Sequence, residues 1–145
     1  MPVAHRVPRL PYVVDAAGFQ WYAGALPSAT GAKIAGGSGW LGGTADTWII
    51  APVVVPVGQS ISKIEMAVHG DTVANLQCDL YPRNTDGSGA SMLTVICPKT
   101  NIDQTLQFSP LSIRQAVAGP SYYVVMYFQG TPSPTGALRF MRIYP

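Results

Sequence analysis

The sequence predicts an all-β fold, an antiparallel β-sandwich of jelly-roll type with an extended N-terminal arm. Three observations point to it. Apolar and polar residues alternate with a period of two through much of the second half of the chain. Turn residues recur roughly every 8 to 12 positions, and no stretch shows the helical period of about 3.6 residues. The 145 residues suit one domain, and 48% hydrophobic residues are enough for a core.

The strand that the pattern defines best is expected at 121–128. β-Forming residues fill every position from Tyr122 on, and no charged residue interrupts them, as is typical of a central strand. Its expected partner is the segment 137–144, because the two prolines and the bounding glycines of 130–136 cannot continue a strand. The two segments are therefore predicted to form a hairpin at the end of the chain.

Shorter strands are predicted before this hairpin, each bounded by typical turn residues. Pro52 interrupts the first of them, which places that strand at a sheet edge or at a bulge. The predicted strands cover residues 47–55, 61–68, 74–81, 92–97, 104–108 and 111–117.

The first 46 residues differ in composition from the rest. Three prolines among the first eleven residues exclude a helix, and eight glycines with several aromatic residues follow between 17 and 45. We therefore expect an arm and a Gly/aromatic-rich loop segment at 1–46 and the β-sandwich domain at 47–145. The arm either contacts a neighbouring subunit or adds an edge strand to its own sheet. Both interpretations concern Leu10, Tyr12, Val13 and Val14.

The charge distribution excludes two classes of partner. Charged residues make up 11% of the chain, and the net charge of +2 comes from scattered lysines and arginines without a cluster, so no nucleic-acid binding is expected. The longest apolar run, 48–57, is half a membrane span and contains two prolines, so no membrane span is expected. The start lacks the apolar core of a signal peptide, which predicts a cytoplasmic protein until assembly or release, or export by another route.

The two cysteines lie in predicted strands on the inward face. Cys78 and Cys97 are either buried thiols or a disulfide between neighbouring strands, and the sequence leaves both open. No Cys-x-x-Cys pair occurs, so we predict neither a metal site nor a cofactor.

Residues suited to catalysis are few. His69 near Asp71 has the composition of a base with an orienting carboxylate, but a histidine in a turn is more often solvent-exposed and inert. Asp71 and Asp79 would be the carboxylate pair for glycoside hydrolysis, yet Asp79 falls at an outward strand position and Asp71 in a turn. We therefore predict that the protein is not an enzyme.

Aromatic residues offer two kinds of binding surface. Trp21, Trp40 and Trp48 lie near glycines, and such side chains on a β-sandwich either anchor a loop or stack on sugar rings. Tyr123 and Tyr127 lie in one row of the central strand, which would be a subunit interface if no second sheet covered it.

Several segments resemble a loose set of uncharacterised bacterial and phage-associated β-sandwich domains. The shared pattern is an apolar strand, a Leu/Val-Pro-x-Gly turn, a Leu-Tyr strand end and a final hairpin with paired tyrosines. The matching segments are 48–64, 76–81, 122–125 and 138–144, within residues 47–145. The resemblance implies the fold and a surface or assembly role without catalysis, and it brings no catalytic residues.

We therefore predict a non-enzymatic structural or interaction protein, a β-sandwich subunit of a larger homo-oligomeric assembly of the virion, fibre or surface type. Its partners would be other copies of itself or other subunits. Contacts between subunits are expected at Leu10, Tyr12, Val13, Val14, Tyr123 and Tyr127. The alternative is a carbohydrate-binding β-sandwich module, whose glycan ligand would contact Trp21, Trp40 or Trp48.

Overall fold

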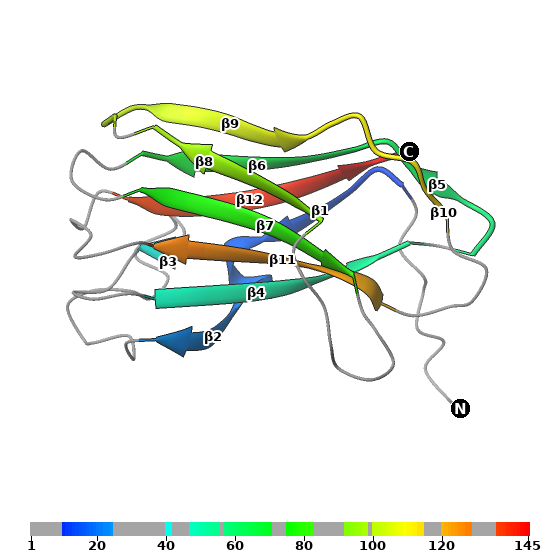
Figure 1. Ribbon diagram of the computed structural model, residues 1–145, viewed down its shortest axis with the longest axis horizontal. Helices are drawn as coiled ribbons and strands as arrows, with labels where there is room; N and C mark the ends of the chain where they lie inside the picture. Colours follow the sequence, from blue (N-terminus) through cyan, green and yellow to red (C-terminus); the bar gives the residue numbers. More distant parts are fainter. Residues whose placement is uncertain are drawn as a thin grey trace.

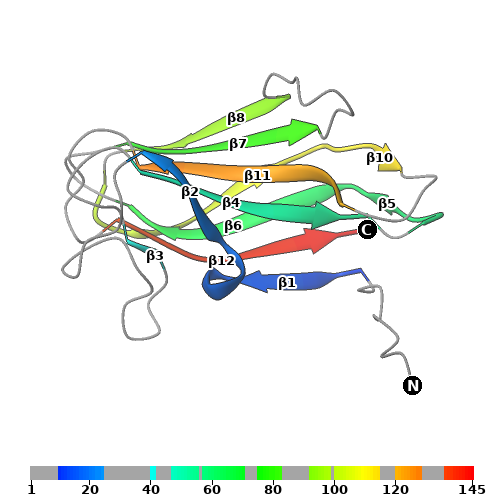
Figure 2. The same cartoon turned by 90° about the horizontal axis from the view of Figure 1, so that it is seen from below.

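The protein is an antiparallel β-sandwich of jelly-roll type, as the sequence predicts, and its two sheets pack face to face in the computed structural model (Figure 1). The structure describes residues 10–24, 40–41, 47–55, 57–70, 75–82, 92–98, 100–114, 120–128 and 136–145. Figure 2 separates the layers, with β7, β8 and β11 in the upper sheet and β12 and β1 in the lower one.

Each sheet is assembled from strands that lie far apart in the sequence. Sheet A has the order β1 (Tyr12–Asp15), β12 (Ala137–Tyr144), β6 (Lys63–His69) and β9 (Asp103–Phe108), with β3 (Trp40–Leu41) also paired to β12. Sheet B has the order β2 (Gln20–Gly24), β4 (Thr47–Val54), β11 (Pro120–Phe128), β7 (Leu76–Pro82) and β8 (Leu93–Cys97). A short pairing joins β5 (Ser60–Ile61) to β10 (Ile113–Arg114), and a single 3-10 turn, η1 (Ala16–Gly18), lies between β1 and β2.

The core forms between the inward rows of the two sheets. Because strand side chains alternate, every second residue of each long strand faces the opposite sheet. Sheet B contributes such rows from β4, β7 and β11, and sheet A from β6, β9 and β12. The largest fully buried side chains of this core are Phe19, Phe108, Phe128, Ile49, Ile61, Ile64, Met66, Leu76, Leu80, Met126, Leu138 and Met141.

The predicted terminal hairpin is wrong. β11 pairs with β4 and β7 in sheet B, whereas β12 pairs with β1, β3 and β6 in sheet A. The two strands each have an apolar inward row, and they bury these rows in the shared core instead of pairing edge to edge. The connection between them therefore passes from one sheet to the other.

The first strand of the predicted series is not simply an edge strand. β4 lies between β2 and β11, but its pairing with β2 extends only from Thr47 to Ile50. Pro52 comes after that stretch and faces Tyr123 of β11, so its missing N–H interrupts no pairing with β2.

Residues before position 47 also contribute to both sheets. β1 and β3 pair with β12 in sheet A, and β2 pairs with β4 in sheet B. The sandwich thus takes strands from both sides of the expected boundary at residue 47. β1 is an edge strand on the chain's own sheet, which was one of the two interpretations of this segment.

The two cysteines are free and buried, so they are core thiols and not a disulfide. Burial raises the pKa of the Cys78 and Cys97 thiols. Among the described residues, no helix is long and apolar enough to cross a membrane.

Tyr12 ties the first strand of sheet A to sheet B. Its hydroxyl donates to the Val54 carbonyl oxygen and accepts from the Val54 N–H, both at 2.8 Å. The β11 partner of Val54 is Pro120, which has no N–H to donate, and β2 does not extend that far along β4. The phenol therefore satisfies backbone groups that the neighbouring strands leave without a partner. Burial raises the pKa of Tyr12, and the bond to Val54 lowers it by less.

Replacing Tyr12 with phenylalanine should destabilise the fold. The Val54 N–H and carbonyl would lose their partner while staying partly shielded from water, at a cost of about 1–3 kcal/mol in the free energy of unfolding. Urea titration followed by tryptophan fluorescence measures this loss. The matched control is Tyr144→Phe, which removes a hydroxyl bonded to Glu65 at the surface of sheet A and should cost less. Equal losses in the two variants would contradict this account of Tyr12.

Candidate functional site

The outer face of sheet B is the candidate site. Alternation along β4, β7, β8 and β11 places one set of side chains away from the core, and most of them are aromatic or aliphatic. We call this surface the aromatic face. Its described members are Trp48, Ile50, Pro52, Gln77, Asp79, Tyr81, Thr94, Ile96, Tyr123, Val125 and Tyr127.

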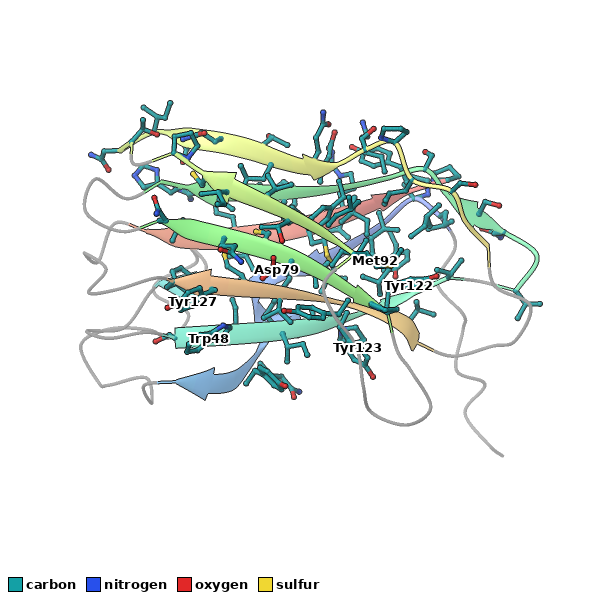
Figure 3. The ribbon with its side chains drawn as sticks, in the orientation of Figure 1. Trp48, Asp79, Met92, Tyr122, Tyr123 and Tyr127 are labelled. Carbon is teal, nitrogen blue, oxygen red and sulfur yellow. The ribbon has the colours of Figure 1, made fainter. Side chains whose placement is uncertain are left out.

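Strand register arranges these side chains in three rows across the sheet. One outer row contains Trp48, Tyr127, Gln77 and Ile96, and the other contains Pro52, Tyr123 and Tyr81. The middle row contains Ile50, Val125, Asp79 and Thr94. The middle row has smaller side chains than the aromatic residues beside it. Figure 3 shows Trp48 and Tyr127 together toward one end of the face, Asp79 near its centre and Tyr123 toward the other end.

Trp48 and Tyr127 form a stacked pair at one end of the aromatic face. The two residues are register partners on β4 and β11, and their ring centroids are 4.1 Å apart with planes 6° from parallel. Paired Cα atoms of neighbouring antiparallel strands are about 4.5–5.5 Å apart. The two rings therefore face each other from neighbouring strands, and their planes are roughly perpendicular to the sheet. The second face of Tyr127 is turned toward β7, on the side of Gln77.

Asp79 occupies the middle row beside this pair. Its side chain receives hydrogen bonds from Gln77 Nε2, at 3.1 Å to Oδ1 and 2.9 Å to Oδ2, and from Thr94 Oγ1 at 2.5 Å to Oδ1. The residue is only 5% exposed, and Val125 next to it in the row is 6% exposed. Sheet B thus holds a fixed set of polar groups at the foot of its aromatic side chains.

The other end of the face contains tyrosines. Burial raises the pKa of Tyr81, and the nearby Asp79 and Tyr22 raise it further, so the Tyr81 hydroxyl stays neutral at ordinary pH. Tyr22 of β2 is 58% exposed, and Ile96 of β8, in the row of Trp48 and Tyr127, is 52% exposed. Flat apolar rings together with neutral hydroxyl and amide groups are the chemistry that accommodates a sugar, which has apolar C–H faces and hydroxyl edges.

The structure brings together residues that the sequence assigned to different roles. Trp48 belonged to the expected glycan site and Tyr123 and Tyr127 to the expected interface, yet all three lie on the aromatic face. Trp21 and Trp40 belong to β2 and β3, and their side chains lie outside the described part of the structure.

The N-terminal members of the expected interface have mixed orientations. Leu10, Tyr12 and Val14 pack against the core, whereas Val13 is 49% exposed. Their contacts with another subunit stay a prediction, as do those of Tyr123 and Tyr127.

Sequence reasoning missed the polar part of this face. Gln77, Asp79 and Thr94 had no assigned binding role, although Leu76, Cys78 and Leu80 on alternate positions already direct Gln77 and Asp79 outward. An aspartate in the middle of a strand is unusual enough to be a signal.

The outer face of sheet A has a different character. Lys63 pairs with Glu65 at 2.8 Å, the Tyr144 hydroxyl donates to Glu65 at 2.8 Å, and Arg142 donates to the same hydroxyl at 3.2 Å. These polar groups satisfy one another.

A second polar cluster on sheet A surrounds His69. Its Nδ1 lies 2.8 Å from Asp103 Oδ1 and its Nε2 lies 2.8 Å from Asn101 Oδ1, while Arg139 donates to the same Asp103 oxygen at 3.2 Å. Asp71, the orienter considered from the sequence, lies outside the described residues. Within the described ranges, no group of His, Cys, Asp and Glu could hold a metal ion.

No protein-family model matches the chain, and no curated protein sequence matches it. Several solved structures do match the chain. A xylan-binding module, CBM15, has a TM-score of 0.60 at 18% identity, over 94% of this chain and 96% of the module. Xylanase 10C of Cellvibrio japonicus, an E385A mutant in complex with xylopentaose, has a TM-score of 0.58 at 19% identity. That match covers 92% of this chain and 28% of the xylanase, so the chain spans about a quarter of its length.

A further match is the C-terminal CBM6 of LamC, a marine laminarinase from Zobellia galactanivorans. It has a TM-score of 0.50 at 14% identity, over 93% of this chain and 99% of that module. At these identities the likeness shows a shared fold. The chain is therefore similar in fold to β-sandwich modules, two of which are carbohydrate-binding modules.

His69 should titrate above the ordinary histidine range. The hydrogen bond to Asp103 raises its pKa most, and the bond to Asn101 raises it further. Because the pKa is raised in the folded state, the cluster stabilises the fold fully below the unfolded value of about 6.5, and this stabilisation is lost as the pH rises through the folded pKa. An NMR titration of the imidazole measures it, with Asp103→Asn as the comparison variant. An unchanged His69 pKa in that variant would exclude Asp103 as the cause.

Proposed function

We propose that the protein is a non-enzymatic carbohydrate-binding module and that the aromatic face is its glycan site. The observation on which this depends is the upright Trp48–Tyr127 stack beside the Gln77–Asp79–Thr94 hydrogen-bond cluster, in which Asp79 is buried. An outward sheet face in contact with water alone has no need of stacked rings or of a fixed carboxylate. The shared fold with a xylan-binding module and a CBM6 supports the proposal.

The geometry suggests how a sugar would bind. A pyranose ring placed over β7 would lay its C–H face against the side of Tyr127 that is turned toward β7. Its hydroxyl edge would then meet Gln77, Asp79 and Thr94, which exchange hydrogen bonds with sugar hydroxyls. The apolar contact would supply most of the affinity, and the polar groups would select the orientation.

The aromatic face also suits a ligand of several sugar units. Tyr127 and Tyr123 lie on the same face of β11 four residues apart, which corresponds to about 13 Å along the strand. A single pyranose cannot contact both tyrosines, whereas an oligosaccharide can. The candidate ligands are therefore polysaccharides, beginning with the xylan named for the similar module.

Removing the stack should abolish most of the glycan affinity. We expect Trp48→Ala and Tyr127→Ala each to weaken binding at least tenfold, that is by about 1.4 kcal/mol or more, because Tyr127→Ala removes the ring that the sugar would contact and Trp48→Ala removes the ring that stacks on Tyr127 and holds it upright. Affinity electrophoresis in gels with soluble xylan, mixed-linkage β-glucan or laminarin finds the ligand, and calorimetry with the matching oligosaccharide measures the loss.

The matched control is Phe140→Ala, which removes a partly buried aromatic side chain from the outer face of sheet A. It should leave the affinity unchanged. Absence of retardation in every polysaccharide gel would overturn the proposed function, and so would wild-type affinity in both stack variants.

A further inference from the structure

We propose that Asp79 makes the aromatic face selective for uncharged glycans, so that chains with carboxylates or other anions are excluded from it. This inference rests on the proposed function and specifies its ligand class. The aromatic face contains one charged side chain among its described residues, and that side chain is Asp79 in the middle row.

No cation offsets this carboxylate within the described structure. The donors to Asp79 are an amide and a hydroxyl, from Gln77 and Thr94, and no ion pair includes it. Both oxygens are already hydrogen bonded, so the carboxylate is held in place and cannot turn away from a ligand. A sugar hydroxyl can still donate to it, because a carboxylate has about four acceptor positions. A second anion can only be repelled.

Burial makes that repulsion stronger than at an ordinary surface site. Asp79 is 5% exposed, so few water molecules and counterions approach it, and charges in partly buried positions are screened much less than exposed ones. A ligand stacked on Tyr127 would lie directly above β7 and close to this carboxylate.

The cations whose side chains the structure describes are not placed to compensate. The described lysine and arginines with defined side chains, Lys63, Arg139 and Arg142, belong to sheet A. Packed sheets are about 10 Å apart, and Lys63 and Arg142 lie on the far side of sheet A, in pairs with other groups. At physiological salt, screening reduces interactions beyond about 8 Å, so an anion on the aromatic face would feel Asp79 and not these cations.

Size-matched polysaccharide derivatives test this selectivity. Hydroxyethyl and carboxymethyl derivatives of xylan and of cellulose differ in charge and little in bulk. For the wild-type protein at low salt, we expect at least about tenfold tighter binding of the hydroxyethyl form in affinity electrophoresis. In Asp79→Asn, which keeps the shape of the side chain and removes its charge, the ratio should fall below about threefold. Asp103→Asn on sheet A is the matched control and should leave the ratio unchanged.

A measurement without a variant keeps the test independent of folding. Raising the salt concentration from 0.01 M to 0.15 M shortens the Debye length from about 30 Å to about 8 Å. Wild-type affinity for the carboxymethyl polymer should then rise only in part, because salt screens this partly buried charge incompletely, while affinity for the hydroxyethyl polymer should stay constant. Equal binding of both derivatives, or a ratio that survives in Asp79→Asn, would overturn the role of Asp79. Failure of the hydroxyethyl forms and of the unmodified polysaccharides to bind would instead overturn the proposed function itself.

Discussion

The constraint on which this structure depends is that two sheets can bury only the sides that face each other. Each long strand must then alternate, and the inward rows of β11 and β12 meet in one core although the strands belong to different sheets. Alternation also determines which side chains face away from the core. Once Val124 and Met126 face the core, Tyr123, Val125 and Tyr127 must point outward, so the core of sheet B determines which residues its aromatic face displays.

The outer faces of the two sheets carry different kinds of side chain. On sheet A, charged groups such as Lys63 and Glu65 pair with their neighbours and leave a surface that water solvates. On sheet B, large rings stand beside a single fixed carboxylate. This asymmetry agrees with the proposal that the ligand is a neutral polymer laid across one face.

Local pattern was enough to predict the fold class and most strands, because alternation and turn residues are encoded within short segments. Local pattern was not enough to predict which strands pair, because an apolar row in β12 fits either an edge-to-edge hairpin with β11 or a face-to-face contact across the core. Trp48, Tyr123 and Tyr127 could be selected from their chemistry, but only the register of β4 with β11 reveals that they share one surface. Asp79 could be recognised as part of the site only from the structure, since its burial depends on neighbours that are distant in sequence.

The strand order of sheet A has a consequence for how the protein is made. β1 pairs with β12 along its whole length, from Tyr12 opposite Ile143 to Asp15 opposite Phe140, and β6 uses the other side of the same strand. During synthesis, β1 and β6 must therefore wait for the strand between them until Ala137–Tyr144 has left the ribosome. Until then the nascent chain exposes the apolar rows of both sheets, and folding of such non-local topologies is slow once it starts. We therefore expect a chaperone to bind the nascent chain during this interval of translation.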